Sequence, residues 1–259
     1  MIGVLLALIV AAPMALGQDT VLSGQAKETT ATEQAKESKA SGQARQLATS
    51  WWQWALAKPL FQDPPVNPLE GAYTDGSQCD GKPVTDTKGK EDTNANKGDK
   101  SKREWFLAGS LATDPLTRTC TVPVGTKLFF PVVNQVAFKT EPTDTEQSLR
   151  KQNSDFMASV LDSPDTKTLV EVDGKEVPSK RLIRADTALF SATQEFLGSD
   201  PVDAVGDGLW VSLPPLSKGQ HTVHFGVSAS SADTDPAKEG PEGFTQDITY
   251  TLKVVPGKG

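Results

Sequence analysis

The feature that most constrains the fold is the apolar run at residues 128–133, Leu-Phe-Phe-Pro-Val-Val. Side chains alternate between the two faces of a strand, so both faces of this strand would be apolar and both would need cover. Pro131 has no N–H to donate, which favours an edge strand, a strand end or a bulge. The run therefore predicts a strand between two layers, with one face covered from outside the sheets.

The segment at residues 44–57 is the best candidate for that cover. Its small and apolar residues recur at helical spacing, and Pro59 would stop the helix. Trp51 and Trp54 fall on the apolar face, so we expect both to be buried against the sheet. Trp52 falls on a flanking face, so we expect it to be partly exposed. The three tryptophans are explained either by core packing or by an aromatic platform for a flat ligand such as a sugar.

Three further segments show regular structure in the middle of the chain. Residues 144–161 have the pattern of an amphipathic helix, and Thr143 and Glu146 have capping-box spacing. Residues 169–177 form a hairpin pattern around Asp173-Gly174. A strand at residues 209–213 would follow an Asp207-Gly208 turn.

The last part of the chain alternates most clearly between apolar and polar residues, at 220–228 and again at 244–254. Half-buried strands joined by short connections indicate antiparallel sheets. The sequence therefore predicts a mainly β fold, an antiparallel β-sandwich of the jelly-roll or immunoglobulin-like kind, with two packed α-helices.

The amino-terminal segment indicates export. Residues 2–16 are almost wholly apolar and end at Ala-Leu-Gly, so residues 1–17 are expected to be a signal peptide. Residues 18–43 would form a flexible polar lead-in, and residues 44–259 a single sandwich domain with a disordered insertion at about 85–104. We expect a secreted or periplasmic protein without a transmembrane segment after signal cleavage.

The chain has two cysteines, Cys79 and Cys120. An isolated pair in an oxidising compartment is most simply a disulfide. Closing a loop of about forty residues would stabilise the fold by roughly 4 kcal/mol in the chain-entropy model. No zinc-type ligand spacing accompanies them, so we expect no metal site.

Several motifs together resemble a family of secreted bacterial proteins of uncharacterised function. They are Trp-Trp-Gln-Trp-Ala-Leu at 51–56, Trp-Phe-Leu-Ala-Gly at 105–109, Arg-Thr-Cys-Thr-Val-Pro at 118–123, Leu-Phe-Phe-Pro-Val-Val-Asn at 128–134 and Leu-Pro-Pro-Leu-x-x-Gly-Gln-His-Thr-Val-His-Phe-Gly at 213–226. The last motif also resembles the turn and strand of immunoglobulin-like sandwiches. The resemblance implies export and supports the domain boundary, and it implies no activity.

Five residues are candidates for ligand binding: Trp52, Glu104, Asp207, Trp210 and His224. Asp207 and Glu104 lie near tryptophans in the sequence, as they would in a sugar site, although the sequence fixes no carboxylate pair. His224 would share its strand face with small polar residues. The other histidine, His221, would lie on the apolar face and bond a loop carbonyl, so the two histidines would not bind one metal together.

The net charge and the absence of known catalytic and cofactor-binding motifs limit the classes of function that the sequence allows. A net charge of −7 argues against nucleic acid as a partner, and no cofactor-binding or catalytic motif is found, so we expect no cofactor. The leading hypothesis is a non-catalytic binding module for carbohydrate or another cell-envelope component. The alternatives are an extracellular polysaccharide hydrolase that uses a carboxylate pair and a structural envelope protein. Exposure of the tryptophans would separate these hypotheses.

Overall fold

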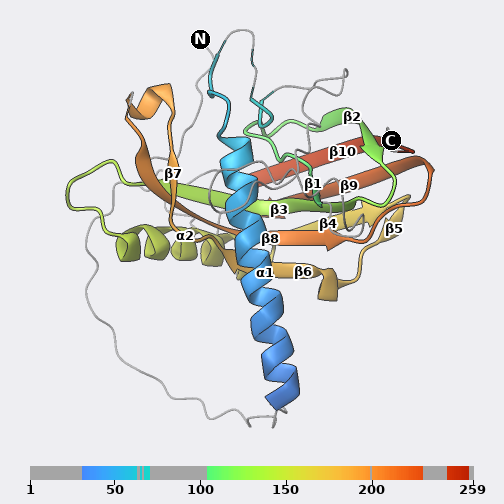
Figure 1. Cartoon of the computed structure of the whole chain (residues 1–259), viewed down its shortest axis with the longest axis horizontal. Coiled ribbons are helices and arrows are strands. Elements are labelled where there is room, and N and C mark those ends of the chain that lie inside the picture. Colours follow the sequence, from blue (N-terminus) through green and yellow to red (C-terminus); the bar gives the residue numbers. More distant parts are fainter. Residues whose placement is uncertain are drawn as a thin grey trace.

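The computed structural model describes residues 31–62, 65, 67–70, 104–198, 200–229 and 244–256. Within these residues the chain forms two five-stranded sheets and two α-helices (Figure 1). The expected mainly β fold with two packed helices is confirmed.

The first sheet, sheet A, is built on a long antiparallel pair, β3 (Lys127–Phe138) and β8 (Val202–Leu213). On the far side of β8 lie β6 (Leu182–Asp186) and β7 (Phe190–Ala192). The short strand β1 (Glu104–Phe106) pairs parallel with the start of β3.

The second sheet, sheet B, has the order β2-β10-β9-β4-β5. These strands are β2 (Leu116–Pro123), β10 (Phe244–Val255), β9 (Gly219–Ala229), β4 (Lys167–Val172) and β5 (Lys175–Glu176). The pairs β1–β3 and β2–β10 are parallel, so the expected antiparallel pattern holds for the central strands and not for these two edges.

Strand β3 carries apolar side chains on both faces, as its sequence requires. Phe130 packs between the sheets, 4.5 Å from Phe225 of β9, and Phe129 faces outward and stacks on Trp210 at 5.2 Å. The pairing with β8 shifts between Pro131 and Val133, so of the three positions that the proline favours, an edge strand, a strand end or a bulge, the structure shows a bulge in the β3–β8 pair. The expectation that both faces of this strand are buried is confirmed.

The core between the sheets is formed by alternate residues of each strand, and two neighbouring strands of sheet B show this clearly. Val223, Phe225 and Val227 of β9 are buried there, and Ile248, Tyr250 and Leu252 of β10 lie beside them. Intervening residues such as Thr222 are exposed. The alternation read from residues 220–228 and 244–254 is confirmed.

Helix α1 (Ala31–Ala55) covers the outer face of sheet A and crosses its strands (Figure 1). It begins earlier than residue 44, so the second half of the expected flexible lead-in is helical. Its end is held by side chains from two distant loops, because Asn67 Nδ2 donates to Ala55 O at 2.8 Å and Gln194 Nε2 donates to Leu56 O at 2.8 Å.

Helix α2 (Glu146–Leu161) packs on the opposite face of sheet A, against β3 and β8. Leu149 joins Ala137 and Val205 of the sheet, while Met157 reaches the main core. The helix is capped by Thr145, which exchanges hydrogen bonds with Ser148. The expected cap at Thr143 and Glu146 was therefore wrong by two residues at each position.

Of the two turns that the sequence predicted, one is confirmed and the other is wrong. Asp173 and Gly174 have positive φ values of 53° and 70° and join β4 to β5, as expected of a tight hairpin. Asp207-Gly208 is not a turn, because it lies in the middle of β8. Two short 3₁₀ helices follow the hairpin, η2 (Ser179–Arg181) and η3 (Glu195–Leu197).

Several expectations concern residues outside the described part of the chain: the signal peptide at 1–17, the first part of the lead-in, the insertion up to residue 103, and Cys79. Cys120 is buried in the core at 1% exposure, and its disulfide with Cys79 stays a prediction. Among the described helices, none combines the length and apolar character needed to cross a membrane.

Candidate functional site

The tryptophan candidates lie together in a buried aromatic layer between α1 and sheet A. Trp51 is the centre of this layer, with ring centroids 5.1 Å from Trp52 and 5.4 Å from Trp210. All three are buried, at 0%, 5% and 0% exposure, whereas Trp54 is half-buried. The expected exposure of Trp52 and burial of Trp54 were therefore wrong. Neither Trp52 nor Trp210 offers a ring face to a ligand.

A glycine explains why Trp52 turns inward. A Cβ atom on Gly206 of β8 would lie 2.4 Å from Nε1 of Trp52, so only a glycine leaves room for this indole. Trp51 and Trp210 donate their Nε1–H groups to Leu107 O at 3.0 Å and Ala185 O at 2.9 Å. Among the described residues, Nε1 of Trp52 has no hydrogen-bond partner. The layer is thus tightly packed, with one unsatisfied donor.

Asp207 is bound by an arginine and does not form a free carboxylate pair. Both of its carboxylate oxygens accept hydrogen bonds from Arg184, each at 2.6 Å. Asp186 lies directly opposite Asp207 in the β6–β8 register. Asp186 in turn accepts a hydrogen bond from Arg150. Both acids are therefore engaged by guanidinium groups.

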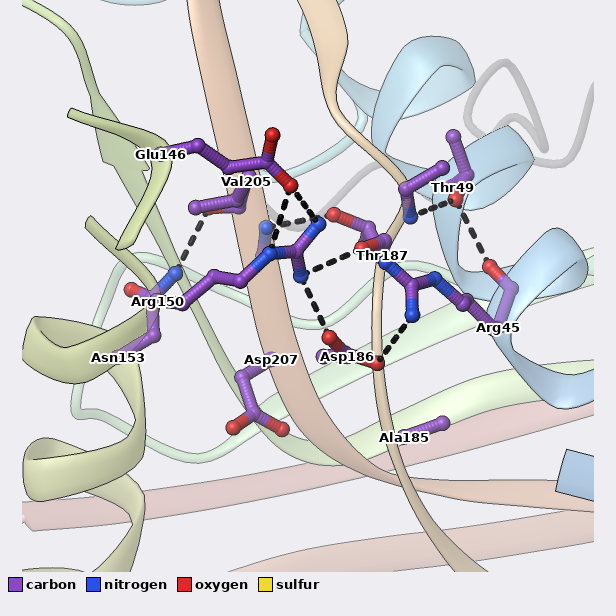
Figure 2. Close-up of polar contacts among 12 residues, drawn as sticks. Arg45, Thr49, Glu146, Arg150, Asn153, Ala185, Asp186, Thr187, Val205 and Asp207 are labelled. Atoms are coloured by element: carbon purple, nitrogen blue, oxygen red, sulfur yellow. Dashed lines mark hydrogen bonds and ion pairs between the residues drawn. The ribbon is translucent and has the colours of Figure 1, made fainter. Parts of the chain in front are cut away.

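Arg150 of α2 lies at the centre of a polar network that joins both helices to β6 (Figure 2). It donates to Glu146 within α2, to Asp186, and to the backbone oxygen of Thr187 at 2.9 Å. Arg45 of α1 reaches the other oxygen of Asp186 at 3.7 Å. These contacts fasten both helices to one sheet edge, which is a structural role.

The remaining two candidates lie far from this layer. Glu104 is 8% exposed at the sheet edge, 3.6 Å from Lys127, and burial raises its pKa above the ordinary value while Lys127 opposes the shift. His224 lies on the outer face of sheet B, with Nε2 2.6 Å from Asp247 and Nδ1 3.7 Å from Glu171. Within the described residues no group of His, Cys, Asp or Glu is arranged to hold a metal ion.

A groove that the sequence did not reveal opens at the end of the sandwich opposite α2. This hairpin groove has a volume of about 380 Å³ and lies between the β4–β5 hairpin with η2 and the segment that follows β8. Its apolar lining consists of Val172, Val177, Pro178, Leu213, Pro214 and Leu216. Its charged lining consists of Asp173, Lys175, Glu176 and Arg181.

The two walls of the hairpin groove are joined by His221. Its Nδ1 lies 2.8 Å from Oδ2 of Asp173 in one wall, and its Nε2 lies 2.9 Å from the backbone oxygen of Ser217, next to the other wall. Hydrogen bonding to Asp173 raises the pKa of His221, and the same bond lowers the pKa of Asp173. The expected bond from His221 to a loop carbonyl is present, but the ring is at the sheet end and is not a core residue.

Ser217, His221 and Asp173 have the composition of a catalytic triad but not its protonation pattern. The Ser217 hydroxyl oxygen lies 3.2 Å from Nε2, but the carbonyl oxygen at 2.9 Å also requires a proton on that nitrogen. Both ring nitrogens therefore face acceptors, which favours the imidazolium form. A general base needs a lone pair directed at the serine hydroxyl. The cluster is a bridge between the groove walls and is not arranged as a nucleophilic site.

Sequence reasoning missed the groove residues because it assigned them structural roles. The hairpin pattern at residues 169–177 gives Asp173 only the role of a turn residue, and no motif points to Arg181. The available signal was the position of polar residues in short connections at one end of the strands, where loops of a sandwich gather.

Comparisons with known proteins add little. No family model matches the chain, and no curated protein matches it. Among solved structures, the cysteine protease inhibitor EhICP2 from Entamoeba histolytica shares 13% identity, with 59% of this chain and 96% of the inhibitor covered and a TM-score of 0.22. Amebosin shares 10% identity, with 58% and 98% covered and a TM-score of 0.18. These scores are too low to support an argument.

Proposed function

We propose that the protein is an exported, non-catalytic binding module for a cell-envelope component and that the hairpin groove is its ligand site. The observation that carries the proposal is the groove itself, an open hollow of about 380 Å³ with an apolar lining and charged residues. That volume lies at the lower end of the range for small-ligand sites. The apolar residues 2–16 and the resemblance to secreted bacterial proteins support a secreted or periplasmic location.

Among the described residues, the acidic groups that the sequence and the groove offer do not support the hydrolase alternative. A glycosidase needs one carboxylic acid to donate a proton and one free carboxylate to act as base or nucleophile. Asp207 and Asp186 are each bonded to an arginine, and Glu104 lies with Lys127 at another edge. At the groove, Asp173 is bonded to His221.

Carbohydrate binding through an aromatic platform is also disfavoured. Trp52 and Trp210 are buried, so a glycan would have to bind through the hairpin groove, whose lining contains no aromatic ring. A neutral glycan therefore remains a ligand to test at the groove and not at the tryptophan layer.

The test is an NMR titration of the isotope-labelled protein with two probes, neutral oligosaccharides and soluble peptidoglycan fragments. We expect shifts of the backbone amides of the groove walls with at least one probe. Leu216→Trp, which fills the groove, should abolish them, while Thr222→Val on the outer face of sheet B should not. Shifts confined to the outer face of sheet B, or none at all, would refute this assignment of the ligand site.

A structural or partner-binding role is the second candidate, supported by a separate observation. Phe61 and Phe196 are 44% and 42% exposed, and their rings lie 5.6 Å apart. Phe61 has a φ of 63°, a conformation that is unfavourable for a bulky residue, and its N–H donates to Glu70 at 2.8 Å. If this pair anchors the protein to a partner, Phe61→Ser with Phe196→Ser should release it from isolated envelopes, whereas Leu216→Trp should not.

A further inference from the structure

The hairpin groove is lined by two acids and two cations, and the strand pleat gives the neighbouring side chains of Lys175 and Glu176 different directions. Lys175 is paired with Val172, whose side chain packs against the core, so the lysine lies on the groove face. Glu176 is paired with Glu171, which lies on the outer face near His224. Paired residues on neighbouring strands share a face. Both residues line the groove, but the pairing turns the Lys175 side chain toward the groove face and the Glu176 side chain toward the outer face.

The other acid of the lining, Asp173, is already engaged by hydrogen bonds. Asp173 Oδ2 bonds His221 Nδ1 at 2.8 Å, and Oδ1 accepts the Thr222 N–H at 2.8 Å. Lys175 is near enough to contribute to the lowered pKa of Asp173, but the two have no ion pair within 4 Å. Within the described residues, neither Lys175 nor Arg181 forms an ion pair.

The rest of the lining is apolar. Val177 and Pro178 line the wall on the hairpin side, and Leu213, Pro214 and Leu216 line the opposite wall. Two cations without acidic partners beside an apolar hollow complement a ligand that is apolar along its length and negatively charged at one end. Because the whole chain carries a net charge of −7, long-range attraction does not favour an anion, and contact with these two cations would have to select it.

We propose that the hairpin groove binds an apolar carboxylate, with Arg181 and Lys175 on the carboxylate and the leucine and proline wall on the apolar part. The proposal rests on the assignment of the groove as the ligand site and specifies the class of ligand. Arginine suits this role because its planar guanidinium can bond both oxygens of a carboxylate. A fatty acid and the free carboxyl terminus of an apolar peptide share this chemistry.

The experiment measures binding of four probes to the purified protein by NMR and calorimetry. The probes are decanoate, decanol, a tetrapeptide ending in Val-Leu with a free carboxylate, and the same peptide as its amide. We expect at least one acid to bind at the groove, and its neutral counterpart to bind about tenfold more weakly or worse, as the loss of a charge-assisted bond predicts. Preference for decanoate or for the peptide acid identifies the natural source.

Variants separate this inference from the assignment of the groove. Arg181→Gln and Lys175→Gln should each weaken the acid by about tenfold and leave the neutral probe unchanged. Lys253→Gln, at an exposed position on the outer face of sheet B, is the control and should change nothing. Equal binding of acid and neutral probes at the groove, or of acid to Arg181→Gln and wild type, would overturn the charge inference and leave the groove as the site. If none of the four apolar probes shifts the groove amides, the inference of an apolar carboxylate ligand is wrong. If the oligosaccharides and peptidoglycan fragments also fail to shift them, the assignment of the groove as the ligand site is wrong as well.

Discussion

Replacing the tryptophans of α1 one at a time tests the packing of the aromatic layer. Trp51 and Trp52 are 0% and 5% exposed, whereas Trp54 is half-buried. Truncating a fully buried tryptophan to alanine costs about 3–5 kcal/mol through lost transfer energy and the cavity that remains. A half-buried side chain loses about half of a full burial term, or roughly 1–2 kcal/mol. We therefore expect large effects for Trp51→Ala and Trp52→Ala and a small one for Trp54→Ala.

Phenylalanine substitutions separate the hydrogen bonds from the packing. Trp51→Phe removes the donor to Leu107 O and leaves that buried acceptor without its partner, which costs about 1–3 kcal/mol beyond the lost ring volume. Trp52→Phe removes an N–H that no described residue accepts, so it should cost less than Trp51→Phe. The two positions are matched in chemistry and differ in this one bond.

The assay is equilibrium urea unfolding followed by far-UV circular dichroism, which reports loss of backbone structure instead of the fluorescence of the tryptophans that are changed. Unchanged m-values would show that the variants unfold from the same compact state. A larger loss for Trp54→Ala than for Trp52→Ala would mean that α1 is rotated about its axis relative to this structure. Equal small losses in all three would mean that α1 does not cover sheet A.

Three further predictions follow from the buried and paired groups. Glu104→Gln should raise stability at pH 7, and this gain should shrink as the pH falls toward the ordinary pKa of 4.5, because burial raises the folded-state pKa of the carboxyl; pH-dependent urea unfolding measures it. His221→Gln should lose most stability between pH 3.8 and 6.5, where Asp173 is ionised and His221 protonated in both the folded and unfolded states, and the loss should fade as the pH rises through the raised pKa of His221; a loss that is constant with pH would contradict the ionic bond. Mass measurement with and without reductant should show that Cys79 and Cys120 are bonded, and two free thiols in the unreduced protein would rule this out.

The sequence predicted those parts of the fold in which one period persists over many residues. Residues 220–228 and 244–254 alternate because one face of each strand meets the core, and the structure confirms both strands. The apolar run at 128–133 predicted that both faces of its strand are covered, and this is confirmed, because sheet B covers one face and α1 covers the other. In these elements the local pattern and the tertiary environment agree, so the pattern was sufficient.

The errors arose where tertiary contacts override a local signal. Asp207-Gly208 has the composition of a turn but lies in β8, where a glycine is needed because a Cβ would lie 2.8 Å from Asn134 Cβ and 3.0 Å from the Trp210 indole. Gly206 gives Trp52 its place in the same way. A helical wheel could not place Trp52, because α1 is contacted by the sheet and also by loops that carry Leu60 and Leu69. The sequence shows which residues are glycines and tryptophans, but it does not show which of them lie in contact in the folded protein.

The aromatic residues and the candidate ligand site lie in different parts of the molecule for a physical reason. The tryptophans are placed by helix and strand periodicity, so they gather where α1 meets sheet A, and burial there excludes a ligand. The hairpin groove is formed by connections at the end of the sandwich that carries β5, away from α2 (Figure 1). Side chains on connections follow no period and need not be buried, which leaves charges such as Arg181 available for binding. In this chain the tryptophans therefore stabilise the interface between α1 and sheet A. The candidate ligand site lies among the short connections at the other end of the sandwich.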